Sequence, residues 1–405
     1  MQRLVTLRHP VSLKTGYNDY RCIIHAHSYL SHDSRGTISE IAAAAKSVGV
    51  NAVFLSNHPK QDVDVVAAGQ TGAVDGVLFV AGSETNGFLA FPGDGKLPPL
   101  DVGEQQFVSS IHKSDGLVFF AHPEEHKDWS ISGLTGTEIY NTHADFKDEK
   151  ELVTALQPKD SKGYGKLLTL LNTMNGYPDE AFAALFDPPL ENLAKYDTLC
   201  RSRTYAAIAG NDSHQNVGFI LKGGEAGKII IEDPLGEKLG EIDTIRNPAV
   251  KAIFGDPIPG KELMRRILDP YPVSFHYVST HVLAREGNVV SLKEALKSGR
   301  TYVAFDWIAD PSGAAFAAEV RGKRYTIGDT IPLDPDLTFR CELPLPATIR
   351  LIHDGVEISK CDGRTMIHKA DEPGVYRFEA YLPVANETRA WIYSGAIRVT
   401  PSKSK

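Results

Sequence analysis

Residues 21–34 read Arg-Cys-Ile-Ile-His-Ala-His-Ser-Tyr-Leu-Ser-His-Asp-Ser, an apolar run that ends abruptly in a His-x-His pair. Alternate residues of an extended strand face the same side, so His25 and His27 can turn both imidazoles toward one metal ion. Asp33 follows six residues later, and the intervening loop can bring its carboxylate back over the strand end. The stretch therefore predicts a metal site at the C-terminal end of a buried strand.

The same arrangement recurs five more times along the chain. In each case a short apolar run ends in residue types that bind metals, namely His58, Glu84, His122, His143, and Asp212 with His214. Short continuous apolar runs are typical of strands buried on both faces, and ligand-type residues at their C-terminal ends are typical of an α/β-barrel active site. After the first run, Thr37-Ile38-Ser39-Glu40 is a capping box that predicts a helix over residues 41–48.

Together these motifs resemble the PHP family, the polymerase and histidinol phosphatase phosphoesterases, over roughly residues 20–310. The matching positions are His25, His27, Asp33, His58, Glu84, His122, His143, Asp212 and His214. The second motif of the family commonly reads Thr-Asp-His, whereas this chain has Ser56-Asn57-His58, a change in the support of a ligand rather than in a ligand. Many relatives also carry His where Asp33 stands.

The resemblance implies an α/β fold, a distorted TIM-like (β/α)7 barrel of PHP type, with its metals at the C-terminal face. We expect residues 1–19 to form an N-terminal lead-in and residues 20–314 the barrel. Within the barrel, the charged and then Pro-punctuated residues 144–203 predict a helical insertion, either a lid or plain packing. Residues 315–405 change to short alternating strands with turn signals, which predict a small all-β immunoglobulin-like sandwich.

The bulk composition excludes several classes of protein. A net charge of −8 over 405 residues argues against a surface built for long nucleic acid. No apolar stretch reaches 18 residues, so we expect no membrane span, and residues 1–15 show no signal-peptide core. The compartment and the oligomeric state stay open. Four scattered cysteines exclude a disulfide scaffold and a zinc ribbon, although Cys341 and Cys361 could pair in an oxidising compartment.

Nitrogen and carboxylate ligands without thiolate suit two or three divalent ions of Zn, Mn or Fe. Carried over from the family, His25, His27, Glu84 and Asp212 would hold one ion, Glu84 would bridge to a second held by His122 and His143, and Asp33, His58 and His214 would hold a third. A metal-bridging hydroxide would then attack the phosphorus of a small anionic phosphomonoester or phosphodiester. Glu84, Asp212 and His214 are the expected catalytic residues, with Asp212 or His214 the candidate proton donor.

Four further residues are candidates for binding the substrate. Arg35 and Lys222 could hold a phosphate, and His126 and Asn86 follow ligands closely in sequence. Two alternatives remain beside the phosphoesterase. One is a PHP-type hydrolase acting on a carboxyl ester, carbamate or amide, and the other is a catalytically inactive metal- or ligand-binding protein. Because all nine ligand positions hold competent residue types, the sequence favours an enzyme.

Overall fold

The computed structural model describes residues 6–126, 129–148, 169, 172–173, 176–184, 186–384 and 386–402. Its N-terminal strands run as the sequence predicts. β1 (Asn18–Ala26), β2 (Ala52–Asn57) and β4 (Val77–Thr85) are parallel neighbours, and α2 (Ile38–Ser47) connects the first two. Thr37 and Glu40 form the predicted capping box at the start of α2.

The next strands depart from a barrel of parallel strands. β4 turns at Asn86 and Gly87, both with positive φ, directly into the antiparallel β5 (Phe88–Phe91). β6 (Leu117–Phe120) is antiparallel to β5, and only then do β7 (Gly136–Asn141) and β8 (Ala206–Gly210) continue in parallel. On the other side of β1, β13 (Ser279–Ala284) and β14 (Thr301–Ala304) are both antiparallel to their neighbours.

The C-terminal strands belong to the same sheet. β14 pairs with β21 (Glu387–Ser394) through Tyr302, Val303 and Ala304, which joins the two halves of the molecule by backbone hydrogen bonds. The long β18 (Thr338–His353) pairs with β19 (Val356–Lys369) and with β20 (Gly374–Val384). The remaining strands of this half are β15 (Ala315–Val320), β16 (Lys323–Thr326), β17 (Thr330–Pro332) and β22 (Ile397–Thr400).

The predicted fold class, a TIM-like (β/α)7 barrel followed by a small all-β immunoglobulin-like sandwich, is therefore wrong. The described chain forms one mixed sheet of 18 strands with few helices. Two features account for the error. Residues 88–91 are too short an apolar run, between Gly and Pro, to be recognised as a strand, and the β14–β21 pairing leaves no separate sandwich.

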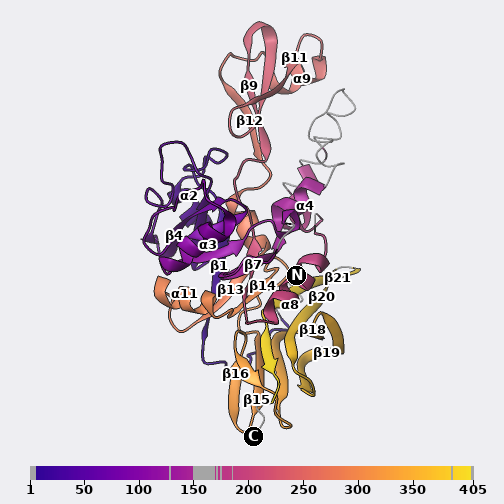
Figure 1. Cartoon of the computed structure of the whole chain (residues 1–405). Helices are drawn as coiled ribbons and strands as arrows, with labels where there is room; N and C mark the ends of the chain where they lie inside the picture. The colour runs from indigo at the N-terminus through magenta and orange to yellow at the C-terminus, as the bar shows by residue number, and fades with distance from the viewer. Residues whose placement is uncertain are drawn as a thin grey trace.

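A second, four-stranded antiparallel sheet projects from one end of the molecule, at the top of Figure 1. Its strands are β9 (Gly218–Gly223), β10 (Lys228–Glu232), β11 (Lys238–Asp243) and β12 (Glu262–Ile267), with α9 (Pro248–Phe254) beside them. Phe219, Leu221, Ile229 and Ile242 give it a small apolar core of its own.

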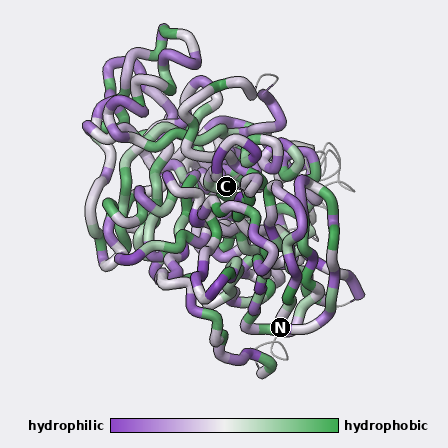
Figure 2. The backbone as a smooth tube through the Cα atoms, turned by 60° about the horizontal axis from the view of Figure 1, so that its bottom comes forward, coloured by the Kyte–Doolittle hydropathy of each residue, from purple (hydrophilic) through white to green (hydrophobic). Residues whose placement is uncertain are grey.

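The remaining strand, β3 (Gly72–Val74), pairs with β4 in the main sheet, and η2 (Glu225–Gly227) connects β9 to β10 in the projecting sheet. The other described helical elements are α3 (Glu104–Lys113), η1 (Pro123–Glu125), α4 (Thr142–Asp148), α7 (Pro178–Ala183), α8 (Leu190–Cys200), α10 (Tyr271–Tyr277) and α11 (Val289–Lys297). Figure 2 shows hydrophobic segments of the backbone running through the interior. Much of the predicted insertion at 144–203 lies outside the described residues. Cys341 and Cys361 are free thiols. Of the described helices, none has the length and apolarity needed to cross a membrane.

Candidate metal centre

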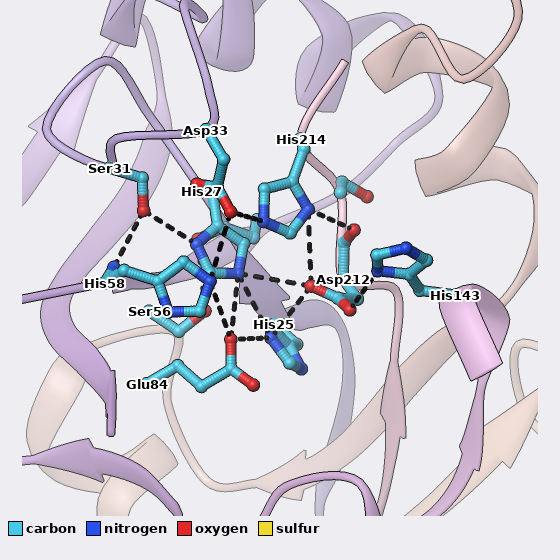
Figure 3. A network of polar contacts seen from close by, with 12 residues as sticks. His25, His27, Ser31, Asp33, Ser56, His58, Glu84, His143, Asp212 and His214 are labelled. Carbon is cyan, nitrogen blue, oxygen red and sulfur yellow. Dashed lines mark hydrogen bonds and ion pairs between the residues drawn. The ribbon is translucent and has the colours of Figure 1, made fainter. Parts of the chain in front are cut away.

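The ends of β1, β4 and β8 meet and bring four ligand-type side chains together (Figure 3). His25 lies near the end of β1 and His27 directly follows it, and both are fully buried. Glu84 lies near the end of β4, and Asp212 follows β8. Nε2 of His25 lies 3.1 Å from Nε2 of His27, 3.0 Å from Oε2 of Glu84 and 3.1 Å from Oδ1 of Asp212. Nε2 of His27 lies 3.3 Å and 3.2 Å from the same two oxygens.

These separations fit a tetrahedral metal ion. Four nitrogen and oxygen donors around Zn²⁺, each at about 2.0–2.1 Å, lie about 3.3–3.4 Å from one another. Two imidazole nitrogens that face each other and two carboxylates in a buried site need a cation between them. The residues present therefore fit a bound divalent ion.

The hydrogen bonds of the imidazole rings point to the same use. Nδ1 of His25 donates to Oε1 of Glu138 at 2.6 Å, and Nδ1 of His214 donates to the backbone oxygen of Asp212 at 2.8 Å. Nδ1 of His27 lies 3.0 Å from Oγ of Ser31, a hydroxyl that can donate or accept. The bonds to the carboxylate and the carbonyl place a proton on Nδ1, so Nε2 is the nitrogen of each of these two rings that can bind a metal. Holding the distal ring nitrogen in this way is the usual support of metal-binding histidines.

Glu84 and Asp212 each present both oxygens to nitrogen ligands. Oε2 of Glu84 and Oδ1 of Asp212 face His25 and His27, while Oε1 of Glu84 lies 3.2 Å from Nε2 of His122. Oδ2 of Asp212 lies 3.3 Å from Nε2 of His122 and 2.7 Å from Nδ1 of His143. Both carboxylates can therefore bridge two cations.

A third group surrounds Asp33 and combines with His27. Oδ2 of Asp33 lies 3.1 Å from Nε2 of His214 and 3.3 Å from Nε2 of His58, and the rings of His27 and His214 stack at 3.8 Å. Oδ1 of Asp33 is buried without a hydrogen-bond partner in the described chain. Such an unsatisfied atom is costly unless something binds it, and a cation would.

The carboxylates of the cluster stay ionised and favour protonated rings on the neighbouring histidines. Burial opposes ionisation of Glu84 and Asp212, but the neighbouring histidines outweigh it and hold the pKa of each carboxyl well below its usual range. Burial likewise opposes protonation of His122, but its carboxylate neighbours raise its pKa to about 12. An ionised Asp212 suits a ligand better than the proton donor expected from the sequence. Metal binding must displace protons from the rings.

Two of the candidate ligands sit in a strained backbone conformation. His122 has φ of 47° and Asp212 has φ of 49°, in the left-handed region that residues other than glycine seldom adopt. Strain of this kind persists where the surrounding structure holds it, and it collects at functional sites.

The four predicted substrate residues are scattered. The guanidinium of Arg35 donates to the backbone oxygens of His32 and Ser34, and Lys222 lies on β9, where it pairs with Glu232. Nε2 of His126 is within hydrogen-bonding distance of two backbone oxygens, those of Gly87 and Ala121. Asn86 and His126 do line a cavity of about 400 Å³ beside His58, Glu84 and His122. The structure brings Lys222 to no part of this cavity.

Two residues that support the candidate ligands were not predicted from the sequence. Glu138 is fully buried and bonds His25, and Ser31 bonds both the ring of His27 and the backbone N–H of His58. A signal for Glu138 existed, because it is the one charged residue of the apolar strand 136–141. Oδ1 of Asn57 accepts from the backbone N–H and the hydroxyl of Ser28.

Comparisons with known proteins add one structural likeness. No protein-family model matches the chain, and the curated proteins give no match. Among solved structures, the chain is similar to a two-domain protein from Bacteroides vulgatus ATCC 8482 that contains a predicted PHP-like metal-dependent phosphoesterase. The match has 13% identity and a TM-score of 0.35, and it covers 96% of this chain and 98% of the other.

Proposed function

We propose that this protein is a metal-dependent phosphoesterase that cleaves a small phosphomonoester or phosphodiester. The observation that carries the proposal is the pair of carboxylates, Glu84 and Asp212, each placed between two sets of histidine nitrogens at 2.7–3.3 Å. Adjacent ions that share carboxylates are the usual apparatus of phosphoester hydrolysis. The motif resemblance to the PHP family supports the same reaction.

In this proposal three groups of residues hold the ions. His25, His27, Glu84 and Asp212 would hold one, and Glu84 and Asp212 with His122 and His143 a second. Asp33, His58 and His214 would hold a third. The donor set suits Zn, Mn or Fe. When bound, such ions lower the pKa of water and offset negative charge on the phosphoryl oxygens.

The chain's own residues prepare this chemistry. Glu138 and the backbone oxygen of Asp212 keep a proton on Nδ1 of His25 and His214, so that Nε2 is the nitrogen of each ring that can bind an ion. Oγ of Ser31 holds the ring of His27 through its Nδ1. Burial of His25 and His27 removes water from one side of the site. The cavity beside His122 leaves room on the other side for a small substrate.

One observation favours a second candidate, a hydrolase for an uncharged carboxyl ester, carbamate or amide. Among the residues that the structure describes, the wall of the 400 Å³ cavity contains no Lys or Arg, and its charged members outside the metal cluster are Glu104 and Glu125. A dedicated phosphate site commonly carries such cations. Here the phosphate would depend on the ions for its countercharge, whereas a neutral ester would need none.

The test is hydrolysis of bis-p-nitrophenyl phosphate, p-nitrophenyl phosphate and p-nitrophenyl acetate, with Mn²⁺ and with a chelator. We expect chelator-sensitive release from a phosphate ester. Asp212→Ala should lower it more than about a hundredfold, because the change removes a carboxylate shared by two subsites. Asp336→Asn is the matched control, since this exposed carboxyl lies in the C-terminal half of the chain.

The outcomes separate the candidates. Turnover of the acetate alone would favour the second candidate. No turnover of any ester by protein shown to contain metal would favour a catalytically inactive binding protein. Unchanged turnover in Asp212→Ala would contradict the assignment of the site.

A further inference from the structure

Glu138 is a buried carboxylate that contacts the candidate metal centre without facing the place of any ion. It lies on β7, is fully buried, and both of its oxygens accept hydrogen bonds. Oε1 accepts from Nδ1 of His25 at 2.6 Å. Oε2 accepts from the backbone N–H of His122 at 2.9 Å and from Nδ2 of Asn141 at 2.9 Å. Glu138 therefore touches two predicted ligands that lie far apart in the sequence.

Asn141 extends this contact to a third ligand. Its Nδ2 donates to Glu138, which turns its Oδ1 the other way, toward the first turn of α4. There Oδ1 accepts from the backbone N–H of His143 at 2.9 Å and of Ala144 at 3.0 Å. The amide of Asn141 thus links the carboxylate of Glu138 to the backbone that carries His143.

The neighbouring strand is shaped around the same carboxylate. A Cβ at Gly210 would lie 2.2 Å from Oε1 of Glu138 and 2.7 Å from Nδ2 of Asn141. Only a glycine lets β8 approach so closely, and Asp212 follows two residues later. The backbone leading to the bridging carboxylate therefore packs directly against the Glu138–Asn141 pair.

We propose that Glu138 is a positioning residue that sets the geometry of two metal subsites at once. It orients the ring of His25 in the first subsite, the strained backbone of His122 in the second, and, through Asn141, the start of the helix that carries His143. The inference rests on the proposed function in that it requires the cluster to bind metal. Its particular consequence is that one substitution outside the ligands weakens both subsites together.

The substitution Glu138→Gln isolates this role because it keeps the shape of the side chain. An amide has one acceptor oxygen and one donor nitrogen. If the nitrogen turns toward His25, it favours the tautomer with the proton on Nε2, which cannot bind a metal. If the nitrogen turns away from His25, it faces two other donors, the backbone N–H of His122 and Nδ2 of Asn141. No orientation of glutamine satisfies all three donors.

The experiment measures metal binding rather than turnover. Mn²⁺ is titrated calorimetrically into metal-free wild type, Glu138→Gln, Asn141→Ala and Glu342→Gln, and Co²⁺ absorption reports ligand geometry. Glu342 is the matched control, since it accepts from the backbone of Ser12 and Leu13 far from the cluster in sequence. We expect Glu138→Gln to weaken two binding events by about 10- to 100-fold and to change the Co²⁺ spectrum.

We expect Asn141→Ala to weaken one binding event and Glu342→Gln to weaken none. Thermal unfolding of the metal-free proteins checks the fold. If Glu138→Gln does not fold, Asn141→Ala decides, and full-strength binding in that variant overturns the inference. Equal affinities and equal Co²⁺ spectra in wild type and Glu138→Gln also overturn it. Wild type that binds no metal would instead refute the proposed function.

Discussion

We expect the protein to become less stable at alkaline pH, because the buried ring of His281 then loses its proton. Its ring is fully buried between two carboxylates, with Nδ1 2.8 Å from Oδ1 of Asp19 and Nε2 3.1 Å from Oδ1 of Asp306. Burial alone lowers the pKa of His281, but the charges of Asp19 and Asp306 outweigh it and raise the pKa to about 9. The protonated ring joins β1, the strand that carries His25, to β13.

The magnitude follows from the difference between the folded and unfolded pKa values. The unfolded value is near 6.5, so the folded state binds the proton more tightly by about 2.5 pKa units, or about 3 kcal/mol. Because the folded pKa is the raised one, this stabilisation is complete below pH about 6.5 and is lost as the pH rises through about 9. We expect the free energy of unfolding to fall by about 3 kcal/mol across that window.

The assay is urea unfolding of the metal-free protein at pH values from 6 to 10, with His281→Gln and His112→Gln beside the wild type. His281→Gln should lose about 3 kcal/mol of this pH dependence, because a glutamine does not titrate, while the histidines of the metal cluster titrate in both proteins. His112 is exposed on α3, so its variant should follow the wild type. A difference in pH dependence between wild type and His281→Gln of less than about 1 kcal/mol over this range would refute the reasoning.

Two further substitutions test the stability of the fold and the number of metal ions bound per chain. Arg377 is buried and pairs with Asp197 of α8 at 2.8 Å and with Glu379, so Arg377→Met leaves two buried carboxylates without a cation and should cost about 3–5 kcal/mol. A cost below about 1 kcal/mol in urea unfolding would contradict this. Asp33 is the one carboxylate of the group formed by His27, Asp33, His58 and His214, and it belongs to neither of the other two groups. Asp33→Asn should therefore lower the metal content by one ion per chain. Elemental analysis that finds an unchanged content would show that Asp33 holds no ion.

Much of the candidate site could be predicted because its ligands follow a local rule. Each ligand-type residue comes at or just after the end of an apolar run, and the ends of neighbouring strands meet. The supporting residues do not follow such a rule. Glu138 sits inside a strand and Ser31 inside a loop, and their roles depend on where β1 and the loop after it lie in space. The position of Lys222 could not be predicted for a similar reason, since Lys222 lies on β9 in the projecting sheet and away from the cavity.

The sequence by itself determined the apolar strands, the capping box of α2 and the order of the ligand-type residues, since these depend on side-chain periodicity and on contacts three or four residues apart. Strand direction and strand partners were decided only by the tertiary structure. A run such as residues 88–91 reads the same whether it pairs parallel or antiparallel, and the hairpin at Gly87 decides which. The pairing of β14 with β21 joins residues about 90 positions apart, and no local pattern contains it.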